Sequence, residues 1–234
     1  MPKLYHHPLC PQSRFARLAL AEYGIEAKLA EEKTQERRHA FLLINPAGET
    51  PVLELDDGAA LSGAAVIAEY LGETHANGSG AGRTVPRLMP VTPLARAETR
   101  RITDWFCRKF FSEVSEPLVT EKVYRRFLPP ALGGGGPDME RVRAARANIR
   151  PHLGYIGWLA STRHWLAGDA LSLADLAAAA HLSSADYLGD VPWAEDASAR
   201  EWYARVKSRP AFRSLLNDRV PGLAPPAAYA DLDF

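Results

Sequence analysis

The sequence predicts two domains of different class, an α/β domain followed by an all-α domain. Strand-like and helix-like segments alternate at first, Gly and Pro are frequent in the stretch that follows, and apolar residues then recur only at helical spacing. The 234 residues, 47% of them hydrophobic, are enough for two modest cores. We therefore expect an α/β domain at 1–75, a linker at 76–93, an all-helical domain at 94–219 and a Pro-rich, acidic and aromatic tail at 220–234.

The first domain is expected to have the element order βαβαββα. Apolar residues from Phe15 to Tyr23 recur at helical spacing, and Gly24 supplies a C-terminal stop. Asp57 and Gly58 separate two β-prone runs, which is a strong signal for a hairpin. The expected elements are, in order, a strand at 3–7, a helix at 13–23, a strand at 26–29, a helix at 35–44, strands at 51–55 and 59–61, and a helix at 64–71.

The second domain shows helical patterns alone, and one of its helices has an informative start. Ser172 and Asp175 have the spacing of a capping box, in which each side chain bonds the backbone amide of the other. The helix that follows is apolar on nearly every face, so it belongs at the centre of the domain. The expected helices are 94–112, 118–128, 138–160 and 173–186.

Composition and charge exclude several classes of protein. Lys and Arg number 28, as do Asp and Glu, so no basic surplus is available to bind nucleic acid. The longest apolar run, 176–182, is far shorter than the roughly 20 residues of a membrane span, and no apolar signal segment precedes the first strand. Two cysteines, Cys10 and Cys107, cannot make a disulfide framework. We expect a cytoplasmic protein that neither binds nucleic acid nor inserts into a membrane.

Adjacent His6 and His7 are the obvious candidates for metal ligands. Successive side chains of a strand point to opposite faces of the sheet, so this pair is poorly placed to chelate one ion. No carboxylate stands nearby at ligand spacing, and Cys10 lies beyond a proline turn. We therefore expect no metal site.

Five segments, taken together and in this order, resemble the cytosolic glutathione transferase superfamily. The resemblance implies a thioredoxin-like first domain that binds glutathione and a helical second domain. It also implies a homodimer in which the α/β domain of one chain meets the helical domain of the other. The segments are 4–13 (LYHHPLCPQS), 45–53 (NPAGETPVL), 67–71 (IAEYL), the capping box at 172–175, and 206–212 (VKSRPAF).

Cys10 is the candidate nucleophile. It precedes a helix, whose N-terminal partial positive charge favours a thiolate over a thiol. The order Cys10, Pro11, Gln12, Ser13 resembles the C-P-x-S turn of monothiol redox proteins and cysteine-type transferases. That resemblance places Cys10 at the catalytic position and makes Ser13 a hydroxyl donor to a bound thiolate. The alternative is that Cys10 is a small apolar filler and Ser13 a helix cap.

Pro51 and Val52 are the candidate peptide clamp. The resemblance implies a cis bond between Thr50 and Pro51, which would turn the backbone of Val52 towards a γ-glutamyl-cysteinyl peptide. A cis bond before proline costs only about 0.5–1 kcal/mol, so a tight turn readily holds it. The alternative is that Pro51 only shapes the turn.

The neighbouring part of the clamp departs from the family pattern. The family usually begins its third helix with an acidic or amide residue followed by Ser or Thr, whereas this chain has Gly63 and Ala64 there. Ser62 is close, but out of register. Losing two charge-assisted hydrogen bonds, each worth roughly 1.5–3 kcal/mol, would weaken glutathione binding at least about tenfold. Glu49 adds a negative charge where an anionic ligand would approach.

The tail and the altered clamp lead to two hypotheses. Together they resemble the glutathione-transferase-like cell-division proteins of alphaproteobacteria. This implies a non-catalytic homodimeric scaffold that binds FtsZ filaments, with Asp231, Asp233 and Phe234 contacting division partners. The second hypothesis is a cysteine-type glutathione transferase or thiol reductase that uses Cys10, and glutathione is required only in this case. A purely structural tail, packed over the helical domain, is the plainer alternative. The sequence favours the scaffold and leaves enzymatic activity open.

Overall fold

A four-stranded mixed sheet forms the centre of the first domain. The computed structural model describes residues 1–75 and 86–231. Strand β1 lies between β2, its parallel neighbour, and β3, and β4 pairs with β3 at the other edge. The register aligns Tyr5 with Val52 and Val52 with Ser62. The strands are β1 Lys3–His6, β2 Lys28–Glu31, β3 Val52–Glu54 and β4 Ala60–Ser62.

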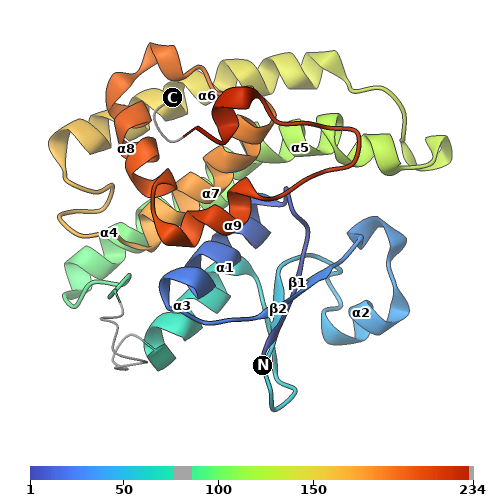
Figure 1. The fold of residues 1–234 in the computed structure, drawn as a ribbon, viewed down its shortest axis with the longest axis horizontal. Coiled ribbons are helices and arrows are strands. Elements are labelled where there is room, and N and C mark those ends of the chain that lie inside the picture. Colours follow the sequence, from blue (N-terminus) through green and yellow to red (C-terminus); the bar gives the residue numbers. More distant parts are fainter. Residues whose placement is uncertain (76–85, 232–234) are drawn as a thin grey trace.

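Helices cover both faces of this sheet, and the alternation of side chains along the strands explains how. Leu4 and Leu53 belong to the main core with α1 and α3, whereas Tyr5 and Val52 pack with Phe41 of α2 in a separate small cluster. Figure 1 shows α1 and α3 on one side of the strands and α2 on the other. The helices are α1 Pro11–Glu22, α2 His39–Ile44 and α3 Ala64–His75. The predicted order βαβαββα and the thioredoxin-like domain are confirmed.

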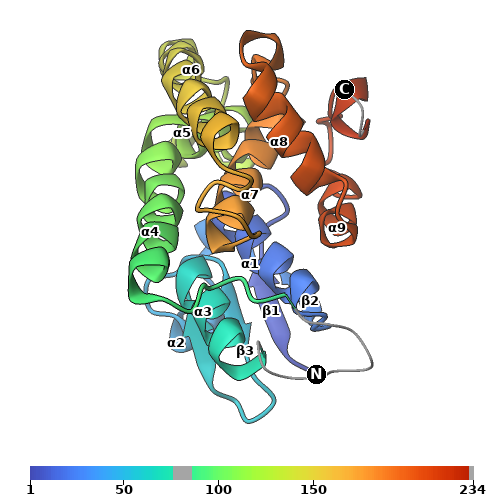
Figure 2. The same cartoon turned by 90° about the vertical axis from the view of Figure 1, so that its left-hand side faces the viewer.

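The second domain is helical, as predicted, with α7 at its centre. Every residue of α7 is buried, and Figure 2 shows this helix surrounded by its neighbours above the α/β domain. The predicted capping box is present at its start: the Asp175 carboxylate accepts from the Ser172 amide at 3.0 Å. The helices are α4 Pro93–Asp104, a π-helical segment Trp105–Ser115, α5 Glu116–Lys122, α6 Met139–Thr162, α7 Leu173–Tyr187, α8 Ala197–Lys207 and α9 Arg213–Leu216.

Three predicted helices differ clearly from the observed ones. The helix expected at 118–128 ends at Lys122, and a 3-10 turn, Tyr124–Phe127, follows it. The segment expected as a helix at 35–44 begins with a short 3-10 turn, Thr34–Glu36, and Arg37 then takes a left-handed conformation before α2 starts. The helix expected to end at 112 instead continues through π-helical turns directly into α5. The π turns contain one extra residue each, so a pattern read at 3.6 residues per turn misplaces this boundary.

The two domains contact each other mainly through α1 and α7. Ser184 of α7 donates to the Leu9 carbonyl at 3.1 Å, just before α1 begins. Most of the expected linker, residues 76–85, lies outside the described residues, but Leu88 is fully buried and its carbonyl accepts from the Leu173 amide. Within the described chain, none of the helices combines the length and apolar character needed to cross a bilayer.

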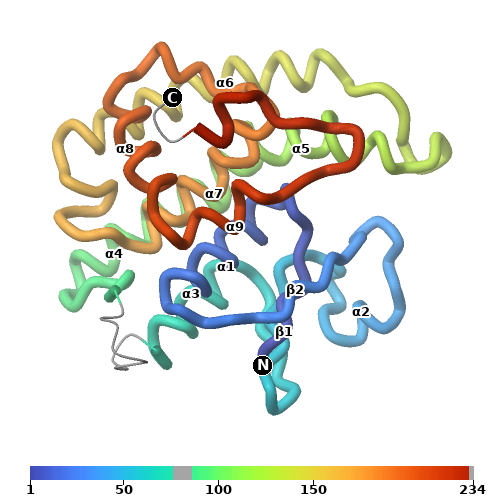
Figure 3. Tube along the Cα trace, viewed as in Figure 1, coloured from blue at the N-terminus to red at the C-terminus, as the bar shows by residue number. Residues whose placement is uncertain are grey.

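The described part of the tail, residues 220–231, folds back over the helical domain. In Figure 3 it leaves α9, loops outward and returns across the same face. Tyr187 of α7 holds this segment at two points, because its hydroxyl donates to the Leu223 carbonyl and accepts from the Val220 amide. Tyr229 ends a short 3-10 turn, Ala227–Tyr229, and is 1% exposed.

Candidate functional site

A cavity of about 630 Å³ opens between the two domains. The first turn of α1, the loop before β3 and the start of α3 form its α/β side, and the π-helical segment with α5 forms its helical side. This volume is within the range of pockets that hold drug-sized ligands. The predicted site residues that line it are Cys10, Pro51 and Ser62.

Cys10 is the N-cap of α1. Its sulfur accepts from the Ser13 amide at 3.4 Å and lies 3.7 Å from the Thr50 carbonyl oxygen, to which the thiol donates. The side chain is 8% exposed. The predicted position at a helix N-terminus is therefore observed, and the sulfur lies beside the proposed clamp.

Ser13 is not brought to the cavity. It is fully buried in the first turn of α1, and its hydroxyl accepts from the His7 amide at 3.3 Å. The helix begins at Pro11, two residues earlier than expected, so the capping position belongs to Cys10 and Ser13 follows inside the helix. In this geometry Ser13 orders the turn before α1.

Pro51 follows a cis bond, as the family resemblance implies. The Pro51 ring lines the cavity, and its carbonyl accepts from the Gly63 amide at 3.1 Å. Val52 is fully buried beneath, in the centre of the sheet. The loop that would clamp a peptide backbone is therefore held in place by the start of α3.

The start of α3 presents no charged group to the cavity. Gly63 has a φ of +94°, a left-handed conformation that a larger residue would adopt only with strain. Ala64 begins the helix, and Ala65 and Val66 line the cavity beside it. Ser62 is the last residue of β4 and its exposed side chain faces the same cavity, one position before the glycine.

The helical domain contributes six lining residues that were not predicted as site residues: Cys107, Phe111, Glu116, Val119, Thr120 and Tyr124. Two of them, Cys107 and Tyr124, have ionisable groups whose pKa values are shifted. Burial raises the pKa of Cys107 to about 12, with a further contribution from Asp104, so this thiol stays protonated. Burial also raises the pKa of Tyr124, and the nearby Cys10 adds to that effect. Cys107 lies within the π-helical segment, where helical periodicity does not show which side chains face the cavity, and Tyr124 begins a 3-10 turn after α5.

Strand β1 ends at His6, one residue earlier than expected, so His7 lies just beyond the strand and the two rings have different surroundings. His7 packs the edge of its ring on Tyr124, with centroids 4.9 Å apart, and burial lowers its pKa to about 4. His6 is buried, and its pKa is also lowered to about 4 by burial, with Arg17 contributing. Among residues 1–75 and 86–231, no three His, Cys, Asp or Glu side chains come close enough to hold a metal ion.

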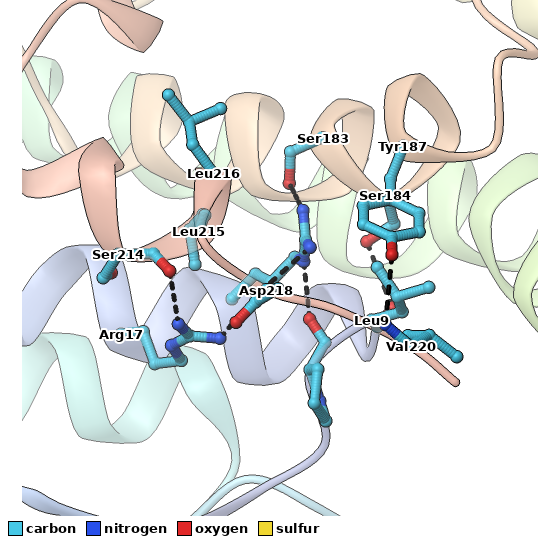
Figure 4. Close-up of polar contacts among 12 residues, drawn as sticks. Leu9, Arg17, Ser183, Ser184, Tyr187, Ser214, Leu215, Leu216, Asp218 and Val220 are labelled. Carbon is cyan, nitrogen blue, oxygen red and sulfur yellow. Dashed lines mark hydrogen bonds and ion pairs between the residues drawn. The ribbon is translucent and has the colours of Figure 1, made fainter. Parts of the chain in front are cut away.

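Behind the cavity, a buried polar network joins α1 to the tail. Arg14 is fully buried and donates to the Pro8 carbonyl, the Ser183 hydroxyl, the Tyr229 hydroxyl and the Asp218 carboxylate. Figure 4 shows the neighbouring part of the network, in which Arg17 donates to Asp218 at 2.9 Å and to the Ser214 carbonyl at 3.0 Å.

This network shows that the tail up to Tyr229 is part of the folded domain. Tyr229 also donates to the Leu215 carbonyl at 3.1 Å. Of the three predicted partner-binding residues, Asp231 is exposed at the surface, and Asp233 and Phe234 lie outside the described residues.

Comparisons with known proteins agree with this architecture. Residues 4–80 match the family model of the glutathione S-transferase N-terminal domain. The chain is 44% identical over 234 residues to FtsZ-localized protein A of Caulobacter vibrioides, covering 99% of this chain and 97% of that one.

Solved structures give the same result over the whole chain. A glutathione S-transferase of Sinorhizobium meliloti has 50% identity and a TM-score of 0.94, with 100% of both chains covered. FzlA of C. crescentus has 45% identity and a TM-score of 0.89, covering 100% of this chain and 99% of that one. The chain therefore belongs to the glutathione S-transferase family.

Proposed function

We propose that this protein is a homodimeric scaffold of the cytoplasm that binds FtsZ filaments and promotes cell division without catalysis. The observation that carries the proposal is the similarity to FtsZ-localized protein A, which extends over 99% of this chain at 44% identity. A relationship of that length includes both domains and the described part of the tail, and it is closer than the 26% identity to glutathione S-transferase 2 of Saccharomyces cerevisiae.

The composition of the cavity supports a scaffold over a transferase. Gly63 and Ala64 offer neither the carboxylate nor the hydroxyl that would bind the γ-glutamyl end of glutathione. Each missing charge-assisted hydrogen bond is worth roughly 1.5–3 kcal/mol. The scaffold itself requires no cofactor.

Co-pelleting with polymerised FtsZ tests the proposal. We expect the protein to sediment with the filaments in a saturable manner and to remain in the supernatant when FtsZ is kept unpolymerised. Sedimentation no greater than that of a glutathione transferase control would refute filament binding. Light scattering of the free protein tests the homodimer, for which twice the chain mass of 25.7 kDa is expected.

Removal of residues 231–234 tests the proposed partner contacts at Asp231, Asp233 and Phe234. Truncation after Ala230 keeps Tyr229 and its hydrogen bonds but removes the Asp231 charge that acts on Lys207, so we expect the melting temperature to fall by no more than about 4 °C and division function in cells to be lost. Full division activity of the truncated protein would show that these residues contact no essential partner.

The second candidate is a cysteine-type glutathione transferase or thiol reductase. The observation that favours it is the position of Cys10, which caps α1 and lies next to the cis-Pro51 loop. Retention on immobilised glutathione and release by free glutathione, both lost in Cys10→Ser, would support this candidate. Filament binding that persists in Cys10→Ser would separate the two functions.

A further inference from the structure

We propose that the tail and the Cys10 turn, residues 7–10, form a coupled switch. When Tyr229 is docked on Arg14 the turn is held closed, and a group bound at the Cys10 sulfur releases the tail. This inference goes beyond filament binding and does not depend on it. It bears on the scaffold because Asp231, a proposed partner contact, closely follows Tyr229 in the chain.

Arg14 holds the chain on both sides of Cys10. It lies one helical turn after the cysteine, and its amide donates to the Cys10 carbonyl at 3.0 Å. Its guanidinium donates through Nε to the Pro8 carbonyl at 2.7 Å, just before the cysteine. A movement of this guanidinium therefore shifts the Pro8 carbonyl or breaks its hydrogen bond, and either change loosens the Cys10 turn.

The tail supplies one of the acceptors for the same guanidinium. The Tyr229 hydroxyl accepts from Nη1 of Arg14 at 3.0 Å, and Asp218 accepts from Nη2 at 3.1 Å. Asp218 also pairs with Arg17 at 2.9 Å (Figure 4), so one carboxylate serves two guanidinium groups. Because Arg14 is fully buried, an N–H that loses its acceptor is costly. When Tyr229 leaves, we expect Arg14 to reorient towards the water that enters.

Tyr229 is the anchor for the end of the tail. Of residues 221–230, all of them described, it is the one that is buried. Tyr187 holds the start of the segment through Val220, and Lys207 donates to the Ala228 carbonyl at 3.3 Å. A segment with one buried side chain is typical of the parts of a protein that open locally without global unfolding.

The wall of the cavity holds the Cys10 turn from the other side. The His7 ring packs its edge on Tyr124, which lines the cavity, and its Nδ1 atom accepts from the Leu9 amide at 3.4 Å. The Cys10 thiol donates to the Thr50 carbonyl at 3.7 Å and is 8% exposed. A group attached to the sulfur replaces the donated proton and enlarges a mostly covered side chain, so we expect the turn to shift.

One side chain, Arg14, therefore connects the two ends of the switch. Cys10 and the Pro8 carbonyl lie on one side of its guanidinium, and Tyr229 lies on the other. Coupling of this kind is reciprocal, because each event changes the equilibrium of the other by the same factor. Undocking of Tyr229 should make Cys10 more accessible, and a group at Cys10 should favour undocking.

The rate at which iodoacetamide alkylates Cys10 tests the first direction. The thiolate displaces iodide and forms a carbon–sulfur bond, the thiol proton passes to solvent, and mass spectrometry of peptides follows this cysteine alone. We expect Tyr229→Phe to raise the rate about tenfold, the effect of losing one hydrogen bond. Val142→Ala, which removes buried atoms of α6, and Tyr155→Phe should leave it unchanged. No rise in Tyr229→Phe, or an equal rise in Val142→Ala, would overturn the proposal.

Hydrogen exchange of the tail tests the reverse direction. The Tyr229 amide donates to the Pro226 carbonyl at 3.0 Å, and its exchange reports on this turn of the tail. In full-length protein alkylated at Cys10, we expect this turn to exchange about tenfold faster than in unmodified protein. Cys10→Ser treated with iodoacetamide is the control and should exchange like the unmodified protein. Identical exchange with and without the Cys10 adduct would contradict the coupling.

Co-pelleting of the same samples with polymerised FtsZ keeps this proposal separate from the scaffold. Faster alkylation in Tyr229→Phe by a protein that does not bind filaments would support the coupling and refute the scaffold. Filament binding by a protein in which neither rate changes would support the scaffold and refute the coupling.

Discussion

Replacing Tyr229 with Phe tests whether the tail is held by the buried network or merely covers it. The substitution removes one oxygen atom and leaves the aromatic ring in place. Its hydroxyl accepts from Arg14 at 3.0 Å and donates to the Leu215 carbonyl at 3.1 Å, and the side chain is 1% exposed. No water can replace either bond without opening the site.

The expected cost follows from those two bonds. A hydrogen bond from a buried guanidinium contributes roughly 1.5–3 kcal/mol, and a neutral bond to a carbonyl about 0.5–1.5 kcal/mol. Arg14 keeps its bonds to Ser183 and Asp218, so its charge is not left unpaired. We expect Tyr229→Phe to lower the free energy of unfolding by about 3 kcal/mol, which for a chain of this size lowers the melting temperature by about 6–12 °C.

Tyr155→Phe is the matched control. Its hydroxyl also accepts from an arginine, Arg101, but in a contact that is exposed to solvent. We expect a loss below about 1 kcal/mol there. Thermal and urea unfolding of both variants provide the comparison. A Tyr229→Phe protein as stable as Tyr155→Phe would refute the claim that this network anchors the tail.

Three further predictions concern other parts of the molecule. Ala64→Ser places a hydroxyl at the start of α3 and should raise the affinity for glutathione about tenfold in a calorimetric titration. The control Ala65→Ser, one position later, should leave that affinity unchanged. Equal gains would show that position 64 is not where the family's hydroxyl binds glutathione. Gly157→Ala should destabilise the protein by about 1–2 kcal/mol, because a Cβ at this position would overlap the Asp196 carboxylate. That carboxylate caps α8 by accepting from the Ala199 amide at 2.9 Å. An unchanged midpoint of urea unfolding would contradict this prediction. Burial lowers the pKa of His6 and His7 to about 4 and that of His181 to about 3, so below pH 6.5 the unfolded chain binds protons that the folded chain does not. The free energy of unfolding, measured with urea, should therefore fall as the pH drops from 6.5 towards 4, by up to about 1.4 kcal/mol per pH unit for each His. His181→Leu should show a shallower decline.

Sequence signals that span only a few residues were sufficient to predict the main elements of the fold. The hairpin at Asp57 and Gly58, and the capping box of Ser172 and Asp175, depend on residues a few positions apart, and both are present. The central position of α7 followed from its apolar character on all faces, because such a helix has no side that favours water.

The candidate site could be predicted only on its α/β side. Cys10 and Pro51 belong to short motifs, and both line the cavity. Cys107 and Glu116 reach it because π-helical turns carry α4 into α5, and a pattern read at 3.6 residues per turn cannot follow such turns.

The role of Tyr229 could not be read from the sequence either. Its partner Arg14 lies 215 positions away, at the other end of the chain. In the sequence, Tyr229 is one aromatic residue in a Pro-rich acidic segment, and nothing local separates an anchor from a partner contact. The structure distinguishes Tyr229, which is buried, from Asp231, which is exposed.

Filament binding measured with and without saturating glutathione tests the central claim most directly. We expect the protein to co-sediment with polymerised FtsZ, and Cys10→Ser to do so with the same affinity, whether or not millimolar glutathione is present. No sedimentation above background, or binding abolished by glutathione or by Cys10→Ser, would contradict the view that this glutathione-transferase fold acts as a non-catalytic scaffold.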